Sequence, residues 1–294
     1  MKALMCSCVL LFPVTLLVSG CAQQSDESAA TPTNTAERES GLPPKSDMGE
    51  GAVASGSEHH YFHKTEKPHA AEWTYTGDTG PSHWGDLSPK YVLAKEGKQQ
   101  SPINLVNPDE AVLPPLEISY RPARINLIYN GHTVEELEEA GSSLTVGGNS
   151  FALKQFHFHA PSEHTIDGKH AAMEMHLVHL DDAGRIAVVG VMIQEGAENP
   201  AFDPVWDYLP TELNKKVEYG ATIDAADLLP GDKRYLHYVG SLTTPPCSQG
   251  VNWYVLLNPV EMSREQIDKF TAIINHNNRP VQPLNDRVIT RSAK

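Results

Sequence analysis

Length, composition and charge set the first limits on this protein. The chain has 294 residues, of which 40% are hydrophobic, so it can bury the core of one large domain or two small ones. Its 37 acidic residues against 23 Lys and Arg give a formal net charge of -14 at pH 7. Such a charge repels polyanions, which excludes nucleic acid as the main ligand.

The N-terminus, residues 1–20, has the features of a lipoprotein-type signal peptide. Lys2 precedes a largely apolar run to Val18 that is too short to span a bilayer comfortably. The segment ends in LVSGC, which resembles a bacterial lipobox and implies lipidation of Cys21. An ordinary secretory signal is the alternative. Both interpretations predict export to the bacterial periplasm or cell envelope, and the first predicts membrane contact only through a lipid anchor at Cys21.

Residues 21–70 are predicted to form a disordered tether that begins at the lipidated cysteine. The segment is rich in Ser, Thr, Glu, Gly and Pro and has almost no large apolar residues before Tyr61, so it cannot bury a core. Histidines near its end could bind metal, although histidines in a mobile arm are commonly only solvated. They are His59, His60, His63 and His69.

Residues 71–294 are predicted to form one mainly β domain. Alternating apolar and polar residues begin at Trp73, and turn signals such as Asn130-Gly131 and Asp167-Gly168 separate the expected strands. Few segments are helical in pattern. The clearest begins at Ser263, which can cap the first turn of the helix.

The stretch QFHFHAPSEHTIDGKHAAMEMHLVH, residues 155–179, contains six histidines. A hairpin folded about Asp167-Gly168 places residue 159 opposite residue 176. Strand alternation then puts three histidines and two acceptors on one face, and apolar residues on the other. The first face holds His157, His159, His176 and Val178 with Gln155 and Glu174, and the second holds Phe156, Phe158, Met175 and Leu177.

Three imidazoles from two adjacent strands suit a tetrahedral zinc ion with one open position, which is typical of catalytic zinc. Gln155 and Glu174 each lie two residues before a predicted ligand, where they can accept its second ring N–H. The sequence therefore predicts one Zn²⁺ per chain. The remaining histidines of the stretch are expected to be structural or solvated; these are His164, His170 and His179.

Ordered sequence blocks between residues 73 and 287 resemble those of α-class carbonic anhydrases of the bacterial secreted type. They include WTYTG, GPSHWGDL, QQSPINL, NGHTV, QFHFHAPSEHT, EMHLVH, AVVGVMI, GSLTTPPC, NWYVL and NNRPVQPLNDR. The resemblance implies a central twisted, mostly antiparallel sheet of about ten strands with short surface helices. It also implies a zinc lyase that hydrates CO2 reversibly to bicarbonate and a proton, by attack of zinc-bound hydroxide.

The resemblance assigns roles residue by residue. It implies zinc ligands at His157, His159 and His176, and ring N–H acceptors at Gln155, Glu174 and the backbone carbonyl of Asn277. A threonine that donates its only O–H to ionised Glu163 can face the zinc only as an acceptor, so Thr243 would select and orient hydroxide. The remaining implied residues are the proton shuttle His132, the bicarbonate contact Thr244, the CO2 wall of Val178, Val188, Leu242, Val251 and Trp253, and the water-ordering residues Tyr75 and Asn130.

Two positions depart from the family pattern. Glu135 stands where the family more often has a neutral amide or other polar side chain, so the water network is expected to differ. Ala94 stands where the family commonly has a cysteine that forms a disulfide with the cysteine at position 247. Cys247 is therefore expected to be either buried and inert or free to form a disulfide between two chains. The second alternative would give a homodimer. Cis peptide bonds are implied before Pro102 and Pro246.

Two other functions remain open at this point. A catalytically weak, carbonic-anhydrase-like binding module would keep the fold and lose part of the site, but all three histidines, Thr243 and Glu163 are present. A zinc-scavenging surface lipoprotein would use the histidines between His59 and His69 and should bind several ions per chain.

Overall fold

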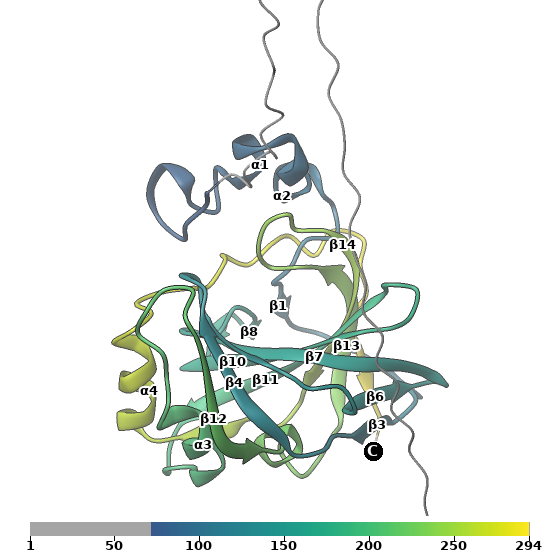
Figure 1. Cartoon of the computed structure of the whole chain (residues 1–294). Helices are drawn as coiled ribbons and strands as arrows, with labels where there is room; N and C mark the ends of the chain where they lie inside the picture. The colour runs from purple at the N-terminus through teal and green to yellow at the C-terminus, as the bar shows by residue number, and fades with distance from the viewer. Residues whose placement is uncertain (1–71, 294) are drawn as a thin grey trace, which may run out of the picture. The chain divides into compact units, whose positions relative to one another are not determined.

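The computed structural model of the chain describes residues 72–293. The predicted signal peptide, Cys21 lipidation and tether lie outside these residues. Within them the chain is mainly β, and a long mixed sheet forms its centre (Figure 1). Among residues 72–293, no helix is long and apolar enough to cross a membrane.

Ten strands follow one another across this sheet, which confirms the predicted fold class. Most neighbours are antiparallel, and the parallel neighbours are β11 with β14 and β16 with β2. In spatial order the strands are β12 (Lys216–Ile223), β4 (Ala123–Tyr129), β5 (Val134–Leu137), β7 (Asn149–His159), β10 (Met173–Leu180), β11 (Ile186–Glu195), β14 (Gln249–Leu256), β13 (Tyr235–Ser241), β16 (Thr290–Ser292) and β2 (Asp109–Ala111).

Smaller elements extend the sheet or lie beside it. β15 (Val260–Met262) pairs with β11, while β6 (Ser143–Val146) pairs with both β3 (Leu116–Ser119) and β7. A separate small sheet contains β1 (Asn104–Leu105), β8 (Thr165–Ile166) and β9 (Lys169–His170). The helices are α1 (Trp84–Leu87), α2 (Leu93–Glu96), α3 (Asp203–Trp206) and α4 (Arg264–Thr271), with 3-10 turns at Gly77–Thr79, Pro89–Tyr91, Pro200–Phe202 and Ala225–Leu228.

Helix α4 begins as its sequence predicts. The Ser263 hydroxyl accepts from the Gln266 backbone N–H, and the Gln266 side chain accepts from the Ser263 N–H, which forms a reciprocal capping box. Ile267 and Phe270 point from α4 into the main apolar core. The helix therefore covers one face of the sheet and leaves the other face for the histidines.

The register of the central strands differs from the predicted one. His176 pairs with His157, and Glu174 pairs with His159, whereas a regular hairpin would put residue 159 opposite 176. The Asp167-Gly168 turn closes only the short β8–β9 pair, where Thr165 does lie opposite His170. Five residues, 160–164, separate the two pairs on one side and three residues, 171–173, separate them on the other, which shifts the register by two residues.

The predicted division between the two faces survives this shift, because moving a strand by two residues keeps every side chain on its side. Phe156, Phe158, Met175 and Leu177 are fully buried in the main core. The opposite face carries the three histidines beside a second apolar cluster that contains Val188, Val251 and Trp253. The sheet thus holds an apolar core on one side and the site on the other.

Candidate active site

Three imidazoles meet at the base of the site, and each uses one ring nitrogen to contact an acceptor. His157 Nδ1 lies 2.7 Å from Gln155 Oε1, and His159 Nδ1 lies 2.6 Å from the Asn277 carbonyl oxygen. His176 instead uses Nε2, which lies 2.9 Å from Glu174 Oε1. Because carbonyl and carboxylate oxygens only accept, these ring nitrogens carry the hydrogens. The predicted acceptors for all three histidines are in place.

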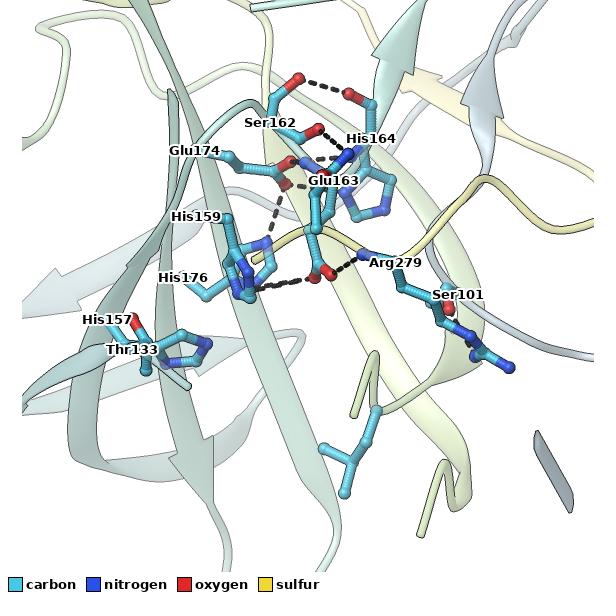
Figure 2. A network of polar contacts seen from close by, with 12 residues as sticks. Ser101, Thr133, His157, His159, Ser162, Glu163, His164, Glu174, His176 and Arg279 are labelled. Carbon is cyan, nitrogen blue, oxygen red and sulfur yellow. Dashed lines mark hydrogen bonds and ion pairs between the residues drawn. The ribbon is translucent and has the colours of Figure 1, made fainter. Parts of the chain in front are cut away.

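The other ring nitrogens are left with lone pairs and face one another. They are Nε2 of His157, Nε2 of His159 and Nδ1 of His176, and one ring nitrogen of each histidine lies within 4.8 Å of the others (Figure 2). Burial holds the pKa of His157 well below its usual range, and it also lowers the pKa of His159; neighbouring imidazoles reinforce both shifts. Neutral imidazole is the form that ligates metal.

The donor atoms and orientations of these residues suit zinc. Three nitrogen donors converge from β7 and β10, and each has a second partner that fixes its orientation. Nε2 of His159 is buried and has no hydrogen-bond partner in the part of the chain that the structure describes. A buried nitrogen without a partner is costly unless something coordinates it. The cluster can therefore hold a metal ion.

Glu174 connects this cluster to the interior of the protein. Its Oε1 accepts from His176 and from His164 Nδ1 at 2.7 Å, and its Oε2 accepts from the backbone N–H groups of Glu163 and His164 at 2.8 Å each. Burial opposes ionisation, but the electrostatic interactions and hydrogen bonds with His164 and His176 hold the pKa of Glu174 well below its usual range. Glu174 is thus a fixed anion beneath the cluster.

His164 is buried and structural, as expected, and it contacts partners that the sequence pattern does not reveal. Its Nε2 lies 2.6 Å from the Tyr238 hydroxyl, which lies 2.8 Å from Ser101 Oγ. Tyr238 belongs to β13 and Ser101 precedes β1, so both are far from the histidine stretch in sequence. Local pattern contains no signal for such long-range partners.

Glu163 lies between the cluster and Arg279 (Figure 2). Its Oε1 accepts from the Arg279 backbone N–H at 2.9 Å, and its Oε2 lies 3.5 Å from His159 Nε2. Oε2 is buried and has no hydrogen-bond donor among residues 72–293. The expected hydrogen bond from Thr243 is not among those that the described residues make, although Thr243 is buried and lines the cavity.

A cavity of about 230 Å³ opens above the three imidazoles. Four of the five predicted CO2-wall residues line it together with Thr243 and Thr244: Val178, Val188, Leu242 and Trp253. Val251 does not line the cavity, because it is buried behind the wall in the cluster with Val188 and Trp253. The cavity therefore has an apolar wall and a polar base.

His132 lies in the cavity wall, away from the cluster at its base. Its ring stacks on Trp73 with centroids 3.6 Å apart and planes 8° apart. Burial lowers the pKa of His132, and the nearby Glu72 partly offsets this. Tyr75 and Asn130 also line the cavity. The sequence pattern does not predict that Trp73 is the stacking partner of His132.

Cys247 is a buried free thiol, in line with the first of its two predicted alternatives. Burial raises the pKa of Cys247 to about 11, which disfavours the reactive thiolate. Gln100 donates to the Cys247 carbonyl and accepts from the Arg279 guanidinium, which also donates to the Ala94 carbonyl. Hydrogen bonds thus connect the segments that a disulfide would have joined. The Ser101-Pro102 and Pro245-Pro246 bonds are cis as expected, and so is Ala160-Pro161.

The fold and the site together define a β-sheet protein with a three-histidine, metal-type centre at the base of a cavity. The model of the eukaryotic-type carbonic anhydrase family matches residues 79–293. A carbonic anhydrase of Klebsiella pneumoniae is 45% identical over 223 residues, which are 75% of this chain and 91% of the relative. One of Pectobacterium atrosepticum is 42% identical over 221 residues, with coverage of 75% and 91%.

A solved structure agrees with these relatives. It is the α-carbonic anhydrase of Thermovibrio ammonificans in complex with the inhibitor sulfanilamide, and it is 49% identical to this chain. The two structures align with a TM-score of 0.74, and the alignment covers 76% of this chain and 100% of that chain. The chain belongs to the eukaryotic-type, or α-class, carbonic anhydrase family. It is an enzyme whose reaction is the hydration of CO2, with CO2 and bicarbonate as its small-molecule substrates.

Proposed function

We propose that the enzyme works with one zinc ion held by Nε2 of His157, Nε2 of His159 and Nδ1 of His176. The observation that carries this is the convergence of three lone-pair nitrogens whose opposite ring nitrogens are all occupied. A bound zinc ion supplies positive charge that lets a coordinated water lose a proton near neutral pH, a property for which carbonic anhydrase is the standard example. The protein's own side chains orient the attacking oxygen, bind CO2 and transfer the proton.

Thr243 and Glu163 orient the attacking oxygen. Glu163 Oε2 is a buried acceptor that has no donor among residues 72–293, and rotation of the Thr243 side chain would supply one. A threonine that donates to a carboxylate can only accept on its other side, so it favours a molecule that carries a hydrogen. This arrangement selects hydroxide over anions that have no hydrogen.

CO2 is proposed to lie against the apolar wall of Val178, Val188, Leu242 and Trp253. Such a surface suits a small molecule without a net dipole and keeps bulk water away from it. Thr244, which also lines the cavity, then contacts the bicarbonate product before water displaces it. Val251 supports this wall from behind.

His132 is the proposed proton shuttle. An imidazole that titrates near neutral pH can accept a proton from ordered waters and pass it to buffer. Tyr75 and Asn130, which share the cavity wall with His132, would order those waters. The Tyr75 hydroxyl is buried without a partner among the described residues, which suits a contact to water.

A test of the proposed centre combines zinc content with a ligand variant. His159→Ala removes a ligand and its contact to Asn277, so the variant should lose zinc and CO2 hydration together. His83→Ala is the matched control, because the His83 side chain is exposed and makes no hydrogen bond among residues 72–293. A His159→Ala protein that kept both zinc and activity would contradict the proposal.

Location is proposed from the N-terminal sequence alone. Export followed by lipidation at Cys21 would anchor the enzyme in the bacterial cell envelope. Cys21→Ser should then move the protein from the membrane fraction to the soluble periplasmic fraction, while wild type that is already soluble would refute lipidation. A homodimer likewise stays a prediction that analytical ultracentrifugation tests.

A further inference from the structure

Glu135 is a carboxylate in the cavity wall that takes part in none of the steps above. It lies on β5, paired with His157 of β7, and its side chain is half-buried. One side-chain amide hydrogen-bonds with it: Gln155 Nε2 lies 3.5 Å from Glu135 Oε1.

The contact with Gln155 bears on His157. Gln155 Oε1 lies 2.7 Å from His157 Nδ1, while its Nε2 points to Glu135. Turning an amide by 180° exchanges its donor and acceptor ends, and the turned form would set the oxygen of Gln155 against the carboxylate. Since an ionised carboxylate only accepts, that form is repelled. Oε1 of Gln155 therefore stays on His157, whose Nδ1 must carry the hydrogen.

We propose that Glu135 is a positioning residue that fixes the orientation of the Gln155 amide. Through Gln155 it sets the hydrogen of His157 on Nδ1 and leaves Nε2 free toward the other two imidazoles. A neutral amide at residue 135 has both a donor and an acceptor, so it accepts either orientation of the Gln155 amide; the carboxylate allows only one. This role rests on the proposed zinc centre and adds a residue to it.

The test is a double-mutant cycle on the zinc-loaded, full-length protein. Glu135→Leu should speed zinc release to a chelator by about threefold to tenfold, less than the roughly 10- to 100-fold typical of direct ligand partners. Glu135→Gln should release zinc at a rate between those of Glu135→Leu and wild type. In a Gln155→Ala background, Glu135→Leu should add nothing, because the amide through which it acts is gone. Glu117→Gln, on the exposed part of β3, is the control that should release zinc as wild type does.

Nuclear magnetic resonance of the metal-free protein gives a second readout. Wild type should show a persistent His157 Nδ1–H signal, and Glu135→Leu should broaden it and speed its exchange with solvent several-fold. Equal acceleration of zinc release in both backgrounds would mean that Glu135 acts by charge alone and would overturn the proposal, as would unchanged spectra. Wild type without bound zinc would instead refute the proposed centre, and the spectra would still test Glu135.

Discussion

At the scale of single residues, the site depends on which atom of each side chain is free. His157 and His159 turn Nε2 toward the cluster, whereas His176 turns Nδ1, because the acceptors Gln155, Asn277 and Glu174 occupy the opposite nitrogens. Strand alternation is enough to predict the cluster of three histidines and two of these acceptors. The third acceptor, a backbone carbonyl far away in sequence, followed only from family resemblance.

Removing the proposed shuttle should separate proton transfer from CO2 chemistry. His132→Ala is expected to lower kcat in dilute buffer, because the ring that receives the proton is gone, while kcat/KM for CO2 changes little. Added imidazole should restore much of the loss by carrying the proton itself. Stopped-flow hydration assays across imidazole concentrations measure this. A loss without rescue would assign His132 a structural role through its stacking on Trp73.

Thr243 offers a matched pair of variants. Thr243→Ala removes the hydroxyl and should lower kcat/KM by about 100-fold, the scale of a misoriented reacting group. Thr243→Ser keeps the hydroxyl and should retain most activity. Anions without a hydrogen should also inhibit the alanine variant more strongly, because the proposed filter is lost. Equal activity of the two variants would argue against the pairing with Glu163.

At the scale of elements, the sequence predicts the faces of β7 and β10 but not their register. A hairpin turn fixes register only where pairing continues from it, and here Pro161 and the side-chain contacts of Glu174 intervene. The error of two residues left every functional side chain on its predicted face.

Strand β5 carries a buried carboxylate that should make stability depend on pH. Glu136 is fully buried between Leu127 and Phe156, and burial, with help from Glu138, raises its pKa to about 8. The folded state thus holds a proton that the unfolded state releases above its ordinary pKa near 4.5. Stability contributed by this group is full below pH 4.5 and falls as pH rises toward 8.

Glu136→Gln removes that penalty and should therefore stabilise the enzyme in alkali. At about 1.4 kcal/mol per pKa unit, the gain at pH 9 should be roughly 3 to 5 kcal/mol, and it should vanish near pH 4. Urea unfolding of both proteins across this range measures it. A gain that did not depend on pH would show that folding does not raise the pKa of Glu136.

His179 on β10 should make stability depend on pH in the opposite sense, so that stability is lost in acid. Its Nδ1 donates to the Ala187 carbonyl and its Nε2 accepts from Tyr120, and burial lowers its pKa to about 4. The folded state excludes a proton that the unfolded state binds below its ordinary pKa of 6.5, so stability is lost as pH falls from 6.5 toward 4. His179→Gln should flatten this part of the curve in the same unfolding assay, and an unchanged slope would contradict the assignment.

At the scale of the whole molecule, the sheet brings together residues that lie far apart in sequence. The cavity takes its base from β7 and β10, its wall from β11 and β14, and its polar edge from Thr243 and Thr244 after β13. Periodicity predicts such strands one by one. It cannot predict that β11 and β14 become parallel neighbours or that Arg279 joins Ala94 to Gln100, because those contacts depend on the complete fold.

CO2 hydration by the purified protein is the decisive measurement for the three-histidine centre, with zinc content determined on the same sample before chelation, after chelation and after zinc is returned. We predict one zinc per chain, loss of hydration as zinc is removed and recovery in proportion to the zinc restored. A folded protein that hydrates CO2 equally well without metal, or that binds several zinc ions and hydrates none, would contradict the proposed three-histidine centre.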